Sequence, residues 1–72
     1  MFIVMEIQYT DDTHMAVVPP TTYDTMNDAL SRFYQTMVAV AQSKVPEHTV
    51  LIMDKIGQVR KIETVYHNEV EA

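Results

Sequence analysis

Only residues 26–43 of this chain carry apolar side chains at the spacing that is typical of an amphipathic helix. The flanking segments have the patterns of strands, so one helix has to cover whatever sheet the rest of the chain forms. A single helix covers one face of a sheet, and the second face then needs another partner. The helical stripe that we expect to face the core consists of Met26, Leu30, Phe33, Met37, Val40 and Ala41.

Capping and breaking residues mark the ends of this helix. Asp24 or Thr25 can cap the first turn, and Asp28 within that turn complements the positive end of the helix dipole. Pro46 prevents the helix from continuing. The sequence therefore predicts a helix with a defined start and a stop before the next apolar segment.

The first part of the chain predicts a hairpin. Residues 1–9 alternate in the manner of a strand, and the polar residues 10–13 form a turn in which Asp side chains can bond their own backbone. A second strand covers residues 14–18. It either ends at Pro19 and Pro20 or has an unpaired edge there, because proline has no N–H to donate to a neighbouring strand.

The last part of the chain predicts a second hairpin. Residues 49–53 are a continuous apolar run of the kind that forms central strands. Residues 54–57 form the turn, with the only glycine of the chain at a position that needs a left-handed backbone. The strand at residues 58–67 has an irregular pattern that indicates either a bulge or two half-buried faces.

Together these segments predict an α+β domain in the order ββαββ, with a four-stranded, mainly antiparallel sheet and one helix packed on one face. We expect this single domain to cover residues 1–67. Residues 68–72 are rich in glutamate and are expected to form an acidic, frayed tail.

Self-association is expected from the size of the chain and the distribution of its apolar residues. A chain of 72 residues buries a small core and, with no cysteine, cannot add disulfides to it. Both faces of the predicted sheet carry apolar residues, and the helix has a second apolar sector, so we expect a homo-oligomer, most simply a two-fold dimer. The alternative is a sheet that curves around the helix in a monomer. The interface residues that we predict are Tyr34, Val38, Ala39, Phe2 and Val4.

No catalytic residue, metal ligand or cofactor is predicted. The histidines, His14, His48 and His67, lack the spacing of a zinc site and lie at expected strand ends, where a solvated or capping role is the simplest reading. One glycine and no cysteine exclude a glycine-rich phosphate loop, a nucleophile elbow and a CxxC motif. An enzyme is therefore not expected.

The second hairpin is the most basic segment of the chain. Lys55, Arg60 and Lys61 could bind phosphate or carboxylate groups, and Tyr34 or Tyr66 could stack on a base. The alternative is a hairpin whose charges keep the protein soluble and protect a sheet edge. The net charge of −5 argues against binding to duplex nucleic acid.

The segments FIVMEIQ and TTYDTMNDALSRFYQTMVAVAQSKVPEHTVLIMDKIG resemble small uncharacterised proteins of bacteriophages and integrated mobile elements. The resemblance covers most of the chain and implies a viral or mobile-element setting, with the bacterial cytoplasm as the site of action. Small acidic proteins of this kind are frequently counter-defence factors. No membrane segment or signal peptide is expected, since the first residues lack a basic segment and run into a polar one.

Three functions remain open at this point. The leading hypothesis is a non-enzymatic, oligomeric binding protein that sequesters a small anionic, nucleotide-derived signalling molecule between its subunits. The second is a protein inhibitor or adaptor that binds a host protein through an acidic surface or a sheet edge. The third is an accessory protein of the virion or of its assembly.

Overall fold

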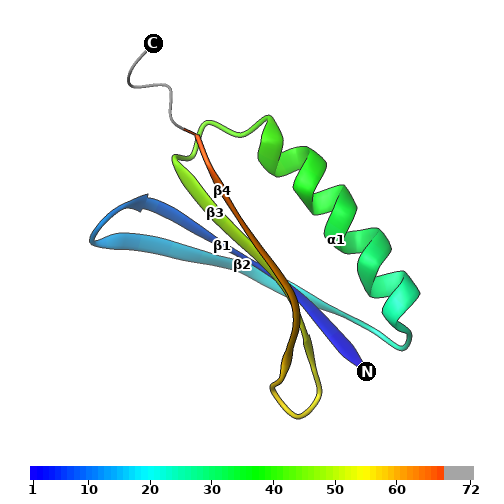
Figure 1. Ribbon diagram of the computed structural model, residues 1–72. Coiled ribbons are helices and arrows are strands. Elements are labelled where there is room, and N and C mark those ends of the chain that lie inside the picture. The colour runs from blue at the N-terminus through cyan, green and yellow to red at the C-terminus, as the bar shows by residue number, and fades with distance from the viewer. Residues whose placement is uncertain (68–72) are drawn as a thin grey trace.

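The computed structural model describes residues 1–67, and the acidic tail predicted at residues 68–72 lies outside the described residues. The elements follow one another as β1 (Phe2–Asp11), β2 (His14–Tyr23), α1 (Met26–Ala41), β3 (Glu47–Asp54) and β4 (Val59–Tyr66). The strands form one four-stranded sheet in the order β2-β1-β3-β4, in which every neighbouring pair is antiparallel. Helix α1 lies along one face of the sheet (Figure 1). The predicted α+β fold is confirmed.

The first hairpin is closed by the aspartate turn that the sequence predicts. The Asp11 carboxylate accepts a hydrogen bond from the Thr13 backbone N–H at 2.8 Å and another from His14 Nδ1 at 2.9 Å. The hydrogen bond from His14 is the main cause that holds the pKa of Asp11 below its usual range. The charged turn is therefore ordered by its own side chains.

Strand β2 continues through Pro19 and Pro20 to Tyr23, well beyond the predicted end at residue 18. The pairing of β1 with β2 shifts register at this point, between Val4 and Glu6. Because β2 is an edge strand, its outer side needs no hydrogen-bond donors. On the inner side, the bulge accommodates the two prolines where they cannot donate to β1. The structure thus shows the unpaired edge, the second of the two alternatives for this segment.

Helix α1 begins where the sequence predicts and ends slightly earlier. Thr25 caps it, since its hydroxyl oxygen accepts a hydrogen bond from the Asp28 N–H at 3.2 Å. The last helical residue is Ala41, two positions before the predicted end at residue 43, and the Gln42 N–H bonds to the Ala39 carbonyl at 3.1 Å. The tighter hydrogen bond of this last turn closes the helix before Pro46 is reached.

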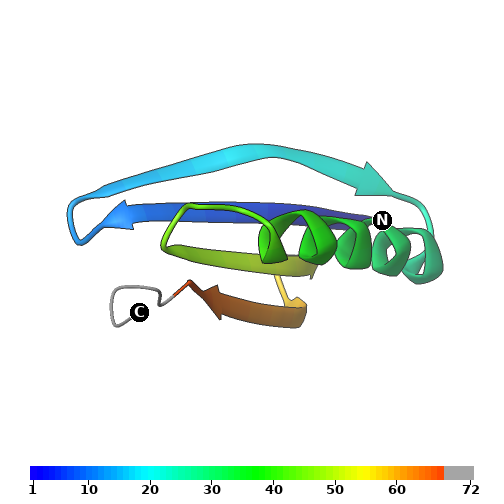
Figure 2. The same cartoon turned by 90° about the horizontal axis from the view of Figure 1, so that it is seen from above.

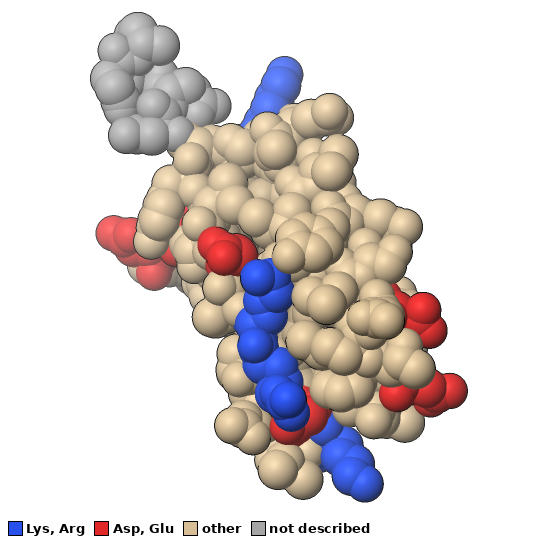
Figure 3. Space-filling model, turned by 45° about the vertical axis from the view of Figure 1, so that its right-hand side comes forward, with Lys and Arg blue, Asp and Glu red and all other residues tan. Residues whose placement is uncertain are grey.

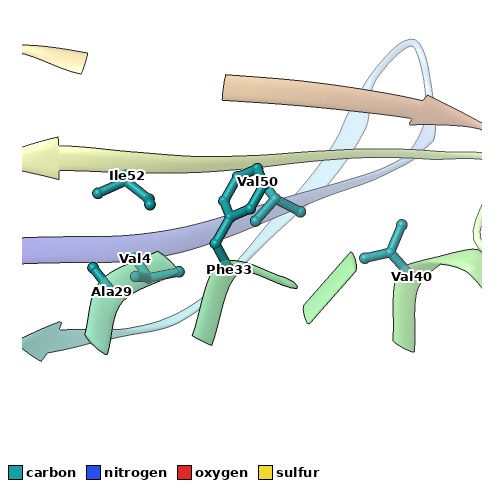
Figure 4. Packing of buried hydrophobic residues seen from close by; sticks show 6 residues of the cluster. All are labelled: Val4, Ala29, Phe33, Val40, Val50 and Ile52. Carbon is teal, nitrogen blue, oxygen red and sulfur yellow. The ribbon is translucent and has the colours of Figure 1, made fainter. Parts of the chain in front are cut away.

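The hydrophobic core lies between α1 and the two central strands (Figure 4). Phe33 is 1% exposed, and Val4 and Ile52, which are paired across β1 and β3, lie beneath the helix. Phe2 packs against the same cluster. Phe2 and Val4, which we predicted at a subunit interface, therefore face α1, and no second subunit can reach Val4 while the helix is in place. Ala41, predicted in the core stripe, is exposed.

The hand of one connection explains why α1 covers this face. Strands β2 and β3 are both antiparallel to β1, so they are parallel to each other, and α1 links them by crossing over β1. Such crossovers are right-handed in nearly all proteins, which fixes the face on which the helix lies. The choice of face therefore does not depend on which face is more apolar.

Figure 2 is seen from above and shows α1 in front of the sheet. The opposite face of the sheet, which we call the open face, has no helix over it (Figure 1). It carries the alternate residues of each strand, and these are opposite one another in the pairing of β1 with its neighbours. Ile62 and Met15 at its two margins are 53% and 60% exposed. The large apolar residues of the open face are Ile3, Met5, Ile7, Tyr9, Met15, Val17, Leu51, Met53, Val59, Ile62 and Tyr66.

Candidate functional site

The turn of the second hairpin is built around one carboxylate. Asp54 accepts hydrogen bonds from the backbone N–H groups of Gln58 at 2.9 Å and Ile56 at 3.1 Å, and Arg60 Nη1 lies 3.4 Å from its second oxygen. These donors, the Gln58 N–H first among them, hold the pKa of Asp54 below its usual range. Gly57 completes the turn with a φ of 92°. Arg60, a predicted ligand residue, is thus already engaged by a carboxylate.

The remaining predicted ligand residues are not gathered into one site. Lys61 lies on the helix side of β4, where its Nζ atom is 5.4 Å from the ring centroid of Phe33 and 5.8 Å from that of Tyr34. Tyr66 lies on the open face, opposite Glu47 in the strand pairing, and Lys55 is an exposed residue of the turn. The structure therefore brings Lys61 and Tyr34 together and separates them from Tyr66.

Charge on this side of the molecule is mixed. The blue basic atoms in Figure 3 form a narrow column with red acidic atoms near both of its ends, and they do not form a broad basic patch. The Arg60–Asp54 pair is one cause of this mixture. An anion that approached the column would also meet the carboxylates near its two ends, which lowers the local attraction.

The outer side of α1 is only partly apolar. Tyr34 and Val38 are 55% and 63% exposed, and Ala39 is also exposed. The Thr36 hydroxyl, on the same helix, bonds to the Arg32 carbonyl at 2.9 Å. The strip formed by Tyr34, Val38 and Ala39 is narrow and much smaller than the open face of the sheet.

An open recess on the surface lies between the end of β2 and the first half of α1, and we call it the Tyr23–Arg32 recess. It has a volume of about 270 Å³ and is lined by Tyr23, Asp28, Ser31, Arg32 and Gln35. Tyr23 is half-buried, and Arg32 is exposed and belongs to none of the ion pairs formed by residues 1–67. A guanidinium, a carboxylate, a hydroxyl, an amide and an aromatic ring therefore line one hollow.

A buried polar pair lies beneath the second half of α1. His48 is 1% exposed, and its Nδ1 atom lies 2.7 Å from a Glu6 carboxylate oxygen. The His48 Nε2 atom is buried without a hydrogen-bond partner. The sequence-based reading of His48 as a solvated residue is wrong, because the pairing of β1 with β3 places it opposite Gln8, under the helix.

His67 joins this pair from the end of β4. The ring centroids of His67 and His48 are 5.6 Å apart, in an edge-to-face arrangement. The His67 Nε2 atom donates a hydrogen bond to the Val40 carbonyl at 2.7 Å. Its backbone N–H also bonds to the Pro46 carbonyl at 2.7 Å. His67 thus ties the end of the sheet to the end of the helix, which is a structural role.

An open recess of about 130 Å³ adjoins the buried pair and is lined by Glu6, Gln8, Ala39, Val40, Ser43 and His48. A histidine held by a carboxylate is the arrangement that a general base needs, and a serine shares the recess. However, the Ser43 hydroxyl accepts a hydrogen bond from the Val45 N–H at 3.1 Å, and His48 Nε2 is buried without a partner. A nucleophile–base contact is therefore not formed between these two residues.

Neither a metal centre nor a membrane helix is found in the described part of the chain. Residues 1–67 contain no group of three or more His, Cys, Asp or Glu side chains that could hold a metal ion. Within the same residues, α1 is 16 residues long, and no helix has the length and apolar character needed to cross a bilayer.

The chain was also compared with known proteins. No protein-family model matches it, and neither the curated proteins nor the solved structures include a match. The resemblance to bacteriophage and mobile-element proteins, and the bacterial cytoplasm that it implies, stay predictions.

Proposed function

We propose that this protein is a non-enzymatic binding protein that captures a small anionic, nucleotide-like ligand. The observation that carries the proposal is the Tyr23–Arg32 recess, the hollow of about 270 Å³ in which Arg32 lies with a half-buried tyrosine. Arginine offers a planar set of donors that fits a phosphate in a bidentate way. The ring of Tyr23 offers a surface for a base.

The other residues of the recess fit the rest of such a ligand. Ser31 and Gln35 supply a hydroxyl and an amide, and the Asp28 carboxylate can accept hydrogen bonds from sugar hydroxyls or base amino groups. Asp28 also repels a phosphate, so the ligand has to place its charge at Arg32 and its hydroxyls at Asp28. This demand on orientation would favour a nucleotide over a simple anion.

Capture is a better reading of this surface than catalysis. Ser31 and Asp28 both line the recess, but no hydrogen bond among residues 1–67 joins them. The buried pair of His48 and Glu6 lies elsewhere, beneath α1. A protein that sequesters its ligand needs affinity and abundance rather than turnover. The predicted counter-defence role requires no more than this.

Thermal unfolding in the presence of nucleotides tests the proposal. Cyclic mono- and dinucleotides and ADP-ribose are the probes, and a ligand should raise the melting temperature by mass action. Arg32→Gln should abolish the rise, whereas Lys61→Met, which removes one cation from the hairpin, should leave it unchanged. If Lys61→Met abolishes the rise and Arg32→Gln does not, the ligand site is the predicted hairpin. If none of the probes raises the melting temperature, the capture function is wrong.

A second function is favoured by the state of the sheet edges. The β2 edge is interrupted by two prolines, whereas β4 is an edge strand without proline and could add a strand from another protein. The charged residues Arg60, Lys61 and Glu63 on β4 protect this edge against indiscriminate pairing. A host protein that copurifies in equimolar amount would support this function, and such a complex would not be expected of a ligand sponge.

A further inference from the structure

The open face of the sheet is more apolar than the face that the helix covers. On β1 the covered side carries Phe2 and Val4 and then two polar residues, Glu6 and Gln8, whereas the open side carries apolar or aromatic residues from Ile3 to Tyr9. Large exposed apolar faces on small proteins usually mark an interface. We propose that a second copy of this chain covers the open face, sheet against sheet, with the two helices on the outside.

The charge of the open face suits a second copy as the occupant. Two copies that each carry a net charge of −5 repel one another, so a surface with few acidic groups is the least unfavourable place for them to meet. Glu47 is the one charged residue that the strand pairing places on the open face between Ile3 and Tyr9 and their partners, and it lies at one end, between Tyr9 and Tyr66. If the two-fold axis lies in the plane of the interface and runs perpendicular to the strands, the two Glu47 carboxylates lie at opposite ends of the interface.

The flat outline of the face is a little over half of the area that each partner typically buries in a stable complex. Four strands about 4.8 Å apart, each contributing seven residues of about 3.3 Å, outline a flat area of roughly 450 Å². Side-chain relief makes the accessible area larger than this outline, toward the figure of about 800 Å² per partner that is typical of stable complexes. Two such faces pack about 10 Å apart, as in a β-sandwich.

Three methionines favour the packing of this face against a second copy of itself. Met5, Met15 and Met53 all lie on it, and methionine side chains adapt to irregular surfaces at low cost in rotamer strain. Leu51, at the centre between Met5 and Ile62, is 9% exposed in the single chain. Flexible residues therefore surround a fixed apolar centre, which favours close packing against a second sheet.

The sandwich changes where a ligand would sit. Because the helices lie outside, the Tyr23–Arg32 recess of each subunit faces away from the interface, and a dimer presents two separate ligand sites. The prediction that a ligand lies between the subunits does not fit this arrangement. The dimer itself does not depend on the ligand-capture function, since it uses the other face of the sheet.

Light scattering on the wild-type protein and two variants tests the proposal. The expected mass of the wild type is twice the 8.3 kDa of one chain. Ile62→Asp places a carboxylate in the interface and should raise the dimer dissociation constant by at least about a hundredfold. Val38→Asp makes a comparable change on the outer side of α1, where the side chain is 63% exposed, and should remain dimeric.

Each alternative result overturns the proposal. A wild-type mass of 8.3 kDa at millimolar concentration, with a folded circular dichroism spectrum, would mean that the open face serves another partner. A dimer that survives Ile62→Asp but not Val38→Asp would place the interface on the helix. If Ile62→Asp does not fold, Thr64→Lys replaces it, because Thr64 is an exposed polar residue of the same face, and its retention of a dimer counts equally against the proposal.

Discussion

The Nδ1 atom of His48 lies 2.7 Å from the carboxylate of Glu6, a residue 42 positions earlier in the chain. Gln8 donates to the same carboxylate oxygen at 3.1 Å. A carboxylate can only accept hydrogen bonds, so both neighbours act as donors to it. This contact places a polar group beneath a helix that otherwise packs on valine, isoleucine and phenylalanine.

A double-mutant cycle on this pair measures how strongly the two residues depend on each other. Glu6→Leu and His48→Leu should each lower the free energy of unfolding by about 1–3 kcal/mol, because each leaves the other polar group buried without its partner. The double variant should cost less than the sum of the two single variants. Urea unfolding of the four proteins checks this, and additive effects would show that the hydrogen bond contributes nothing to stability.

The turn carboxylate of Asp54 predicts a loss of stability in acid. Its pKa in the folded protein lies below the usual value of 3.8 because the Gln58 and Ile56 N–H groups and Arg60 stabilise the ionised form. The stabilisation is complete above pH 3.8 and is lost as the pH falls through 3.8 and then through the lower folded pKa. Asp54→Asn should remove this part of the pH dependence in acid unfolding experiments.

The backbone donors, rather than the arginine, should account for most of this shift in pKa. The Gln58 N–H is the largest cause, and the hydrogen bond and the charge of Arg60 each contribute less than the Ile56 N–H. In Arg60→Gln the pKa of Asp54, measured by NMR titration of its carboxyl carbon, should therefore rise but stay below 3.8. A return to 3.8 or above would show that the ion pair and not the turn sets the pKa.

Gly57 should resist substitution for a purely conformational reason. Its φ of 92° is unfavourable for residues with a Cβ atom, yet an added Cβ would meet no atom within 4 Å. Gly57→Ala should therefore lower the free energy of unfolding by about 1–2 kcal/mol. Gly57→Asn should cost less, since asparagine tolerates a positive φ better. If both variants unfold at the same urea concentration as the wild type, the strain is absent.

Local signals were sufficient for the parts of the fold that depend on neighbouring residues. Thr25 as the helix cap, the aspartate turn at Asp11 and Gly57 with its positive φ are each determined within four residues. Their hydrogen bonds form between groups that the chain places close together in any conformation. The sequence therefore predicted these features and, from them, the ββαββ order.

The face covered by the helix could not be predicted in the same way. Both sides of β1 begin with apolar residues, Phe2 and Val4 on one side and Ile3 and Met5 on the other. Glu6 on the covered side looks like a surface residue until its pairing with His48 is known. Because the hand of the β2–α1–β3 crossover determines the covered face, apolar content alone gave the wrong side for Phe2 and Val4.

The candidate sites depend on strand register, which explains why sequence reasoning missed them. The His48–Glu6 pair exists only because Gln8 and His48 are opposite each other across β1 and β3. Arg32 and Tyr23 form one recess because α1 returns along the end of β2. Two weak signals were present in the chain: polar residues inside an apolar strand, and an arginine on the first half of the helix.

Lys61 offers a test that separates structural from ligand-binding roles. Its ammonium group lies 5.4 Å from the ring centroid of the buried Phe33, within the range of a cation–π interaction, and the Lys61 side chain is half-buried. Lys61→Met keeps most of the chain and loses the charge, and it should cost no more than about 1 kcal/mol in the free energy of unfolding. Lys61→Ala should cost more, because it uncovers the Phe33 ring.

Urea unfolding of both variants beside Lys44→Ala, an exposed lysine outside the strands and helix, provides the comparison. Equal losses in Lys61→Met and Lys61→Ala would mean that the charge on the ring, and not the cover by the methylene chain, stabilises this edge. If neither variant lowers the free energy of unfolding, Lys61 has no structural role. Its position beside Tyr34 would then be best explained by the predicted hairpin site, and the nucleotide titrations of Lys61→Met would decide between that site and Arg32.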